Sequence, residues 1–333
     1  MTILFATHPR FSEHDTGTWH PERPARLDAV LAGIEGSGVA DGVVRFEPRA
    51  ATLEEVGLVH PRTYLEALER YCGAGGGSID GDTMVVPESW SAALYAAGAG
   101  LDAVERLQRG EGDSAFCAVR PPGHHATIDR AMGFCLLSNI AITAAALAEQ
   151  GERVLIVDYD AHHGNGTQAV FESDPRVMYV SFHEYPLYPG TGGLYETGTG
   201  EGKGTTINVP VPAGTTGDVI RIGIEIVVAP RVAEFAPTWL LLSAGFDAHR
   251  ADPLTSMGLS AGDFADITTD LLAFAPPGRR VAFLEGGYDL DALTDSTAAC
   301  IASLAGETLH PERPTSGGPG RSVIDDVAMI HLG

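Results

Sequence analysis

Five short stretches of this chain bring together the side chains that most often do chemistry in proteins: histidine, aspartate, glutamate and tyrosine. A lone histidine or aspartate in a loop is usually a turn residue or a helix cap. Five such stretches would each need a separate structural reason, so we interpret the set as one functional site. The stretches are Arg120-Pro-Pro-Gly-His124-His125, Asp158-Tyr-Asp160-Ala-His162-His163-Gly-Asn165, Phe182-His183, Asp247-Ala-His249 and Glu285-Gly-Gly-Tyr288.

Two carboxylates and one imidazole in this set are suited to hold a single metal ion. Asp160 and His162 are two residues apart, and Asp247 comes from a distant segment. Three protein ligands leave a position open for water and substrate, which is typical of catalytic Zn²⁺, although a set without thiolates also fits Fe²⁺ or Co²⁺. Two negatively charged ligands weaken the Lewis acidity of the metal, so a separate base is useful, and His124 or His125 can supply it.

Each of these stretches follows a short apolar run of the kind that forms a strand buried on both faces. Helical segments over residues 89–109, 139–150 and 217–234 lie between the runs, with Ser138 and Asp218 near their N-caps. Such alternation predicts an α/β fold with one open, mainly parallel sheet flanked by helices, and ligands bind outside the carboxyl ends of such strands. The runs are Ala115–Val119, Val154–Val157, Val177–Ser181, Thr206–Val211, Trp239–Ser243 and Val281–Leu284.

Length and composition narrow the class of protein further. The 333 residues carry 21 Lys+Arg against 44 Asp+Glu, a formal net charge of −23. This acidity argues against nucleic-acid or membrane partners and favours cationic ones. No signal peptide is visible and the longest central apolar run, Ile140–Ala148, is too short to span a bilayer, so we expect a cytoplasmic protein. We expect one domain over residues 1–333, with Pro311–Gly320 on the surface, and a homo-oligomer is compatible with the sequence.

From His20 to Asp289 the chain resembles the histone deacetylase / acetylpolyamine amidohydrolase family, in particular its class II and bacterial members. The resemblance implies an arginase/deacetylase-like fold, and one Zn²⁺ per chain held by Asp160, His162 and Asp247. The matching motifs are His20-Pro-Glu-Arg-Pro-Ala-Arg26, Arg120-Pro-Pro-Gly-His-His-Ala126, Gly133-Phe-Cys135, Asp158-Tyr-Asp-Ala-His-His-Gly-Asn-Gly166, Gly245-Phe-Asp-Ala-His249 with Asp252-Pro253, and Glu285-Gly-Gly-Tyr288.

The same resemblance implies catalytic roles for five residues. His125 would be the general base for the attacking water and then the acid for the departing amine, with Asn165 orienting it. His124 would be its electrostatic partner, oriented by Asp158. Tyr288 would donate a hydrogen bond to the oxyanion that forms when the amide carbonyl is attacked.

The resemblance also implies a substrate tunnel and a second cation. Gly133, Phe134, Tyr188 and Leu254 would line the acyl-lysine tunnel, with Tyr188 standing where the family usually has Phe, and Arg26 would line the region through which acetate leaves. A monovalent cation, K⁺ or Na⁺, would bind mainly to backbone oxygens of residues that include Asp158, Ser181 and Phe182, together with Asp160 and His162.

The expected reaction is removal of an acetyl or related acyl group from the ε-amine of lysine. An alternative keeps the chemistry but takes small acylated amines such as acetylpolyamines. Polyamine-specific relatives carry a glutamate where this chain has Leu254, so the sequence favours acyl-lysine. A remote alternative is a non-catalytic acyl-lysine binding protein. A two-manganese hydrolase of the arginase kind is disfavoured, because Gly164 and His249 stand where its extra aspartates would be.

Overall fold

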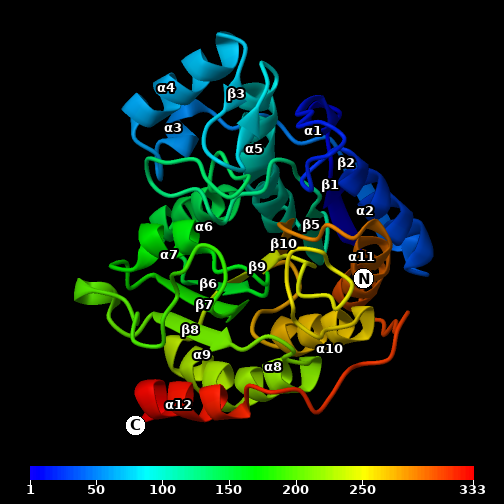
Figure 1. The fold of residues 1–333 in the computed structure, drawn as a ribbon, viewed down its shortest axis with the longest axis vertical. Coiled ribbons are helices and arrows are strands. Elements are labelled where there is room, and N and C mark those ends of the chain that lie inside the picture. Colours follow the sequence, from blue (N-terminus) through cyan, green and yellow to red (C-terminus); the bar gives the residue numbers. More distant parts are fainter.

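The computed structural model describes all residues, 1–333, and its centre is one eight-stranded sheet in which every strand pair is parallel (Figure 1). The strand order is β2-β1-β5-β10-β9-β6-β7-β8, and a separate pair, β3 and β4, is antiparallel. The strands are β1 (Ile3–Ala6), β2 (Val43–Phe46), β3 (Gly77–Ser78), β4 (Met84–Val85), β5 (Ser114–Cys117), β6 (Val154–Asp158), β7 (Val177–Glu184), β8 (Thr206–Val211), β9 (Trp239–Ala244) and β10 (Arg280–Leu284).

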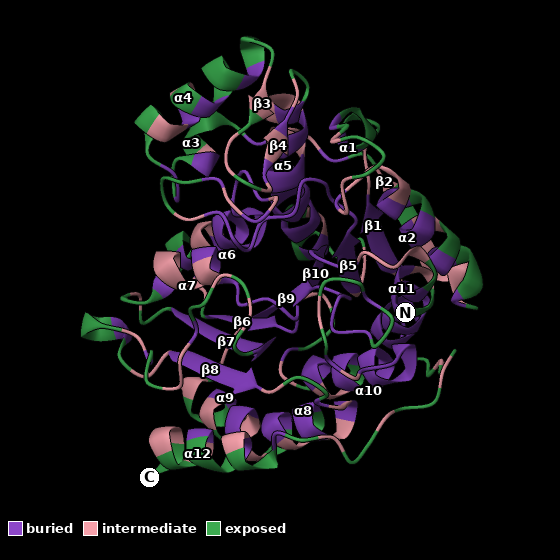
Figure 2. Cartoon of the chain, in the orientation of Figure 1, coloured by how far each residue is buried: buried purple, intermediate pink, exposed green.

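Helices cover both faces of this sheet, and Figure 2 shows that the central strands are buried while the outer faces of the helices are exposed. α5 and α6 pack together and against β10, β6 and β9, whereas α2, α10 and α11 pack on one another. No helix is both long and apolar enough to cross a membrane. The α-helices are α1 (Arg10–Glu13), α2 (Ala25–Gly36), α3 (Leu53–Val56), α4 (Arg62–Gly73), α5 (Ser89–Gln108), α6 (Asn139–Glu149), α7 (Asn165–Phe171), α8 (Gly217–Gly223), α9 (Ala229–Phe235), α10 (Ala261–Leu272), α11 (Leu290–Leu304) and α12 (Arg321–Leu332).

The predicted α/β class with a parallel sheet is confirmed. The six predicted strands all exist: Thr206–Val211 matches at both ends, and the ends of the other five differ by at most three residues. Two strands of the main sheet, β1 and β2, were not predicted, and neither was the short pair β3 and β4. β1 is a four-residue strand next to the N-terminus, and β2 is an edge strand whose residues are only partly buried, so neither shows a long apolar run. Ser138 is the N-cap residue of α6, but its side chain makes no capping bond. Thr216, not Asp218, is the N-cap residue of α8.

The helix predicted over residues 217–234 is continuous but changes its winding. α8 leads into a π-helical turn, Ile224–Val228, and then into α9. Pro230 stands in the first turn of α9 and has no N–H to donate to the carbonyl four residues earlier. The wider turn immediately before Pro230 accommodates that missing bond, and π-turns of this kind commonly occur as short insertions in α-helices.

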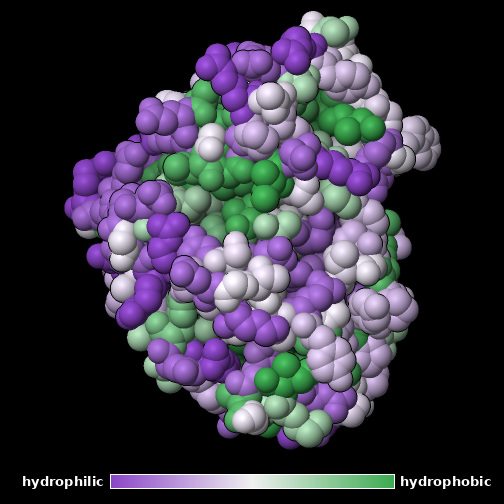
Figure 3. All heavy atoms as spheres, turned by 90° about the vertical axis from the view of Figure 1, so that its left-hand side faces the viewer, coloured by the Kyte–Doolittle hydropathy of each residue, from purple (hydrophilic) through white to green (hydrophobic).

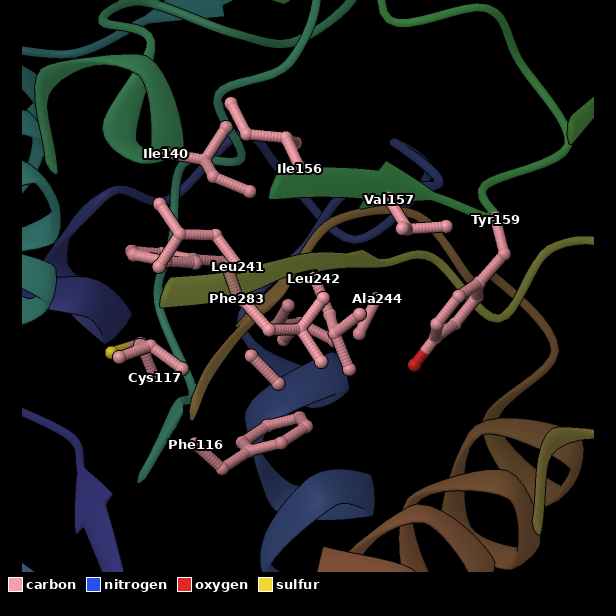
Figure 4. Packing of buried hydrophobic residues seen from close by; sticks show 14 of the residues in the cluster. Phe116, Cys117, Ile140, Ile156, Val157, Tyr159, Leu241, Leu242, Ala244 and Phe283 are labelled. Carbon is pink, nitrogen blue, oxygen red and sulfur yellow. The ribbon is translucent and has the colours of Figure 1, made fainter. Parts of the chain in front are cut away.

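The core fills the space between the sheet and its helices. Figure 4 shows Ile156, Leu241 and Phe283, from β6, β9 and β10, among the buried residues. All three have no exposed surface. Close approach of α5 to this layer needs a residue without a side chain, because a Cβ on Gly100 would lie 2.5 Å from Phe283 Cζ. The core therefore fixes how far each strand end lies from the next.

α12 is reached through residues 306–320, here named the C-terminal strap. Glu312 on the strap accepts a 2.6 Å hydrogen bond from His249 Nε2 and pairs with Arg250, both on the loop after β9. Asp263, in the first turn of α10, accepts hydrogen bonds from the backbone and side chain of strap residue 315. The predicted surface segment is thus tied to a loop that begins at the end of β9.

A buried histidine links this fold to pH. His60 Nδ1 lies 2.9 Å from the carbonyl of Ile128, and its Nε2 accepts a hydrogen bond from the Ser138 N–H at 3.0 Å. Both bonds require the neutral ring with its proton on Nδ1. Burial is the main cause that lowers the pKa of His60 to about 4, although hydrogen bonds to backbone carbonyls oppose it.

We expect this histidine to make the protein less stable in acid. The unfolded chain binds a proton near pH 6.5 and the folded chain only near pH 4, so stability is complete above about pH 6.5 and falls towards pH 4. The contribution of His60 to the free energy of unfolding should fall by about 3 kcal/mol between pH 7 and pH 4. Urea unfolding of the protein and of His60→Gln at pH 7 and pH 4 measures it. The difference between the two proteins should shrink by that amount in acid, and a constant difference would contradict the assignment.

Candidate active site

The carboxyl ends of five adjacent strands meet in one place. In the order β5, β10, β9, β6 and β7, these strands lead into the stretches that carry His124 and His125, Tyr288, Asp247, Asp160 and His183. Side chains as far apart in the sequence as His124 and Tyr288 therefore lie together at the carboxyl ends of the strands. This is the position at which an open parallel sheet binds its ligands.

Asp160, His162 and Asp247 come together as the sequence predicted, and all three are buried. One donor atom from each lies within 4.8 Å of the others. His162 Nδ1 is 2.8 Å from Asp247 Oδ2 and 3.3 Å from Asp160 Oδ1. The three donors thus face a common point, and the set consists of two carboxylates and one imidazole.

Backbone amides hold the two carboxylates in this position. Asp160 accepts hydrogen bonds from the N–H groups of His162 and Gly286, both at 2.8 Å, and Asp247 accepts one from Ala161 at 2.8 Å. Gly286 also makes room, because a Cβ there would lie 2.4 Å from Asp247 Oδ2. The strand ends therefore fix the carboxylates before any ligand arrives.

The electrostatics of this cluster favour a cation. Burial raises the pKa of Asp247 to about 7, and the negative charge of Asp160 adds to the effect. Burial opposes the charged form of Asp160 as well, but the nearby His124 and His162 lower its pKa. Two buried carboxylates this close repel one another, and a divalent metal ion between them would remove that repulsion.

His124 and Asp158 form a buried pair, with Nδ1 3.1 Å from Asp158 Oδ2. Burial alone would lower the pKa of His124, but the charges of Asp160 and Asp158 outweigh it and raise the pKa to about 10. Asp158 also accepts a hydrogen bond from the Tyr179 hydroxyl at 3.1 Å. His124 is thus held as an imidazolium in this arrangement.

His125 has the opposite character. Its Nδ1 is 2.8 Å from Asn165 Oδ1, which is an acceptor, so Nδ1 carries the proton and Nε2 is free to accept one. Burial lowers the pKa of His125 well below its usual value, and the charges of His124 and His162 lower it further. The two neighbouring histidines therefore differ: one is charged, and the other is neutral with a free nitrogen.

Tyr288 follows β10 and lies close enough to Asp160 and Asp247 to be affected by their charges. Its ring packs edge-on against Phe134, with centroids 5.7 Å apart, and beneath the Arg26 guanidinium, 5.1 Å from the ring centroid. Burial raises the pKa of Tyr288 well above its usual value, although Arg26 opposes the shift. Its hydroxyl therefore stays protonated and can donate a hydrogen bond. The Tyr288 N–H donates at 2.7 Å to Asp252, which fixes the backbone of this residue.

Arg26 is fully buried, and it supports the loop before Tyr288 by donating to the carbonyls of Gly287 and Glu285. Its charge is balanced by Glu22, which lies 3.3 Å away and also pairs with the buried Arg120. The network thus ties the predicted acetate-channel arginine to the loop that precedes the two histidines.

A cavity of about 250 Å³ opens onto His162 of the candidate metal-ligand cluster and onto His125 and Tyr288. The predicted tunnel residues Gly133, Phe134, Tyr188 and Leu254 all line it. Asp82 and Leu187 line it too and were not predicted. Asp82 lies in the turn between the two-residue strands β3 and β4, which show no apolar run, and it is marked only by the turn-forming sequence Asp80-Gly-Asp82. Leu187 follows β7 by three residues, but it is apolar, so a search for polar residues after apolar runs does not reveal it.

The predicted monovalent-cation residues also lie together at the ends of two paired strands. Asp158 and Ser181 are direct partners in the register of β6 and β7, and Phe182 follows in β7. All three are buried. The Ser181 hydroxyl is 2.9 Å from His183 Nδ1, so the strand end is well ordered by its own side chains.

Comparison with known proteins bears on this arrangement. The family described as Histone deacetylase domain matches residues 20–304, which include every residue of the cavity and of the metal-ligand cluster. The chain belongs to the histone deacetylase family. Membership of this family supports a deacetylase activity, that is, hydrolysis of an amide.

Relatives of this deacetylase come from several branches of life. It is 41% identical over 320 residues to a probable deacetylase of Archaeoglobus fulgidus, covering 94% of this chain and 89% of that protein. It is 36% identical to the chloroplastic histone deacetylase 10 of Oryza sativa, over 99% and 76% of the two chains. The crystal structure of the HDA15 HD domain superposes with a TM-score of 0.92 at 34% identity, covering 99% of this chain and 94% of that one.

Gly133 offers a test of how tightly this deacetylase positions His125. Its φ is +55°, and a Cβ there would lie 2.4 Å from His125 Cδ2. We expect Gly133→Ala to lower the free energy of unfolding by about 1–2 kcal/mol, the cost of a left-handed non-glycine backbone. We also expect kcat to fall by up to about 10²-fold, because a displacement of about 1 Å at a catalytic group has that effect.

Gly110→Ala is the matched control for this change. Gly110 has φ +76° and open space around its Cβ position, so alanine there adds backbone strain without any contact with the site. In urea unfolding, Gly110→Ala should show the backbone cost alone, and Gly133→Ala should lose at least as much stability because its Cβ also overlaps His125. Only Gly133→Ala should lose activity. Equal kcat values for the two variants would show that His125 tolerates the contact.

Proposed function

We propose that this protein is a Zn²⁺-dependent deacylase that removes acetyl or related acyl groups from the ε-amine of lysine. The observation that carries the proposal is the cluster of three possible metal ligands at a cavity that His125, His162 and Tyr288 line, with His124 paired to Asp158 beside it. Family membership supports the amide hydrolysis. The proposal goes beyond family membership in two respects, the identity of the metal and the acyl-lysine substrate.

The three ligand side chains fit Zn²⁺, which accepts nitrogen and carboxylate donors and needs an open fourth position for catalysis. Asp160, His162 and Asp247 would hold it. When bound, Zn²⁺ lowers the pKa of a water molecule and polarises a carbonyl oxygen. A second ion, K⁺ or Na⁺, is proposed near Asp158 and Ser181, where it would stabilise the strand end behind the site.

The protein's own side chains would then manage the protons. His125 Nε2 accepts the proton of the attacking water and returns it to the leaving amine, since Asn165 holds the proton on Nδ1. His124 remains charged beside Asp158 and stabilises the oxyanion that forms when water attacks the amide carbonyl. Tyr288 donates its hydroxyl hydrogen to the same oxyanion.

The experiment compares metal-depleted protein with protein reloaded with Zn²⁺, K⁺ being present throughout. Turnover of an acetyl-lysine peptide and of N-acetylspermidine is measured with each, with and without a hydroxamate that binds metal. The proposal predicts turnover of the peptide that requires Zn²⁺ and is abolished by the hydroxamate. A higher kcat/KM for acetylspermidine would overturn the substrate assignment. Stoichiometric Zn²⁺ binding without hydrolysis of any acylamine would indicate a binding protein.

A further inference from the structure

A second cavity, here named the side cavity, lies beside the substrate tunnel and has a volume of about 450 Å³. Its walls are mostly apolar. The two tyrosine hydroxyls in its lining are already bonded, since Tyr64 donates to the carbonyl of Leu136 at 2.6 Å and Tyr71 to that of Ser78 at 2.9 Å. Their rings therefore present carbon surface. The cavity is lined by Tyr64, Ala67, Leu68, Tyr71, Ser78, Ile79, Asp80, Asp129, Arg130 and Ala131.

Two segments of chain form a common wall between the side cavity and the tunnel. One contributes Asp80 to the side cavity and Asp82 to the tunnel; the other contributes Ala131 and Gly133 in the same way. Two residues of chain span at most about 7 Å. A substrate that enters the tunnel therefore passes within about 7 Å of the side cavity.

Hydrogen bonds hold this wall in place. Asp80 Oδ1 accepts from the N–H groups of Thr83 at 2.8 Å and Asp82 at 3.2 Å, which closes a tight turn. The Thr83 hydroxyl then accepts a hydrogen bond from the Phe134 N–H at 3.2 Å, which joins the two segments. The side cavity is therefore a formed feature of the tunnel mouth.

We propose that the side cavity binds an apolar side chain one or two residues away from the acyl-lysine of a peptide substrate. In an extended peptide, side chains two residues apart lie about 7 Å from one another, which matches the thickness of the wall. Three aspartates, Asp80, Asp82 and Asp129, surround the two openings against one arginine, Arg130, so the peptide carries basic residues as well. This inference rests on the proposed acyl-lysine activity and names its substrate class.

Figure 3 shows a face on which hydrophobic side chains gather in a hollow in the upper half of the molecule, the half that contains α4 and β3 in Figure 1. A small acylated amine has no second side chain to fill the side cavity, whereas a peptide does. An occupied side cavity therefore separates peptide substrates from small amines.

The first experiment uses the Zn²⁺-loaded protein and a set of basic acetyl-lysine peptides. Each peptide has one leucine at position −2, −1, +1 or +2 relative to the acetyl-lysine, and alanine at the others; the reference peptide has alanine at all four. Partial burial of a leucine is worth about tenfold in affinity, so one position should raise kcat/KM about tenfold. Ratios below about twofold at every position would overturn the proposal.

The second experiment fills the cavity. Ala67 is exposed on α4 and lines the side cavity, so Ala67→Phe should bring the leucine-to-alanine ratio close to one. Ala32→Phe makes the same change at an exposed position of α2 that lines no cavity described here, and it should keep the ratio of the unmodified protein. Persistence of the preference in Ala67→Phe would place the apolar subsite elsewhere and overturn the proposal.

A binding measurement separates this inference from the proposed reaction. Fluorescence anisotropy reports binding of the labelled leucine and alanine peptides to Zn²⁺-loaded Tyr288→Phe protein, which turns substrate over slowly. Tenfold tighter binding of one leucine peptide supports the side cavity even if hydrolysis of acyl-lysine is never seen. Equal binding with normal hydrolysis by the unmodified protein would overturn the side cavity and leave the reaction standing.

Discussion

Replacement of His125 by alanine is expected to lower kcat by about 10²–10⁴, the usual contribution of a positioned general base. Nε2 of His125 is the free nitrogen of a neutral ring whose Nδ1 is 2.8 Å from Asn165. KM should change little, because the ring is small compared with the cavity surface that contacts substrate. Steady-state kinetics and Zn²⁺ content of His125→Ala measure both effects.

Asn165→Ala provides the comparison for His125→Ala. It leaves the base present but removes the acceptor that fixes its tautomer, so kcat should fall by less than in His125→Ala. Both proteins should hold one Zn²⁺, because neither side chain belongs to the metal-ligand cluster. Unchanged turnover in His125→Ala would show that another group takes the proton.

Tyr288→Phe is expected to lower kcat by about 10²–10³, the usual effect of losing one hydrogen-bond donor to an oxyanion. The phenylalanine ring keeps the contacts with Phe134 and Arg26, so the fold and KM should be preserved. The measurement is kcat for an acetyl-lysine peptide, with thermal unfolding as a check on structure.

Tyr188→Phe is the matched control, because it removes a hydroxyl from the same cavity. Its ring lies edge-on to His125, at 5.2 Å between centroids, and edge-on to His162 at 6.4 Å. The Tyr288 ring packs instead against Phe134 and Arg26, so the two hydroxyls have different surroundings. We expect a much smaller change in kcat than for Tyr288→Phe. Equal losses in the two variants would show that both hydroxyls act only through the shape of the tunnel.

The strand-end residues could be predicted because the sheet follows from local pattern. β6 and β9 are apolar runs buried on both faces, so their carboxyl ends, Asp158 and the segment before Asp247, could be placed at one edge. β2 could not be found in this way, because an edge strand that contains Arg45 shows no continuous apolar run. The sheet pattern thus revealed the six strands from β5 to β8 in the sheet order and missed β1 and β2 at one side of the sheet.

Residues that act through loops could not be placed from the sequence. Asp82 reaches the tunnel through a turn closed by Asp80, and Asp252 holds the backbone of Tyr288 from 36 residues away. These positions depend on contacts between segments distant in the sequence, which spacing does not record. The resemblance to a family supplied roles for the motif residues, but it assigned none to these two.

The C-terminal strap belongs to the folded unit, although it lies beyond the residues that match the family. The family match stops at residue 304, yet Glu312 lies beyond it and holds His249, two residues after Asp247 of the candidate metal-ligand cluster. Helix α12 beyond the strap buries Ile324 completely. A chain shortened to the boundary of the recognisable family would keep every motif residue and still lose the support of its metal-ligand loop. The folding unit therefore extends beyond residue 304, where the family match ends, and includes the C-terminal strap and α12.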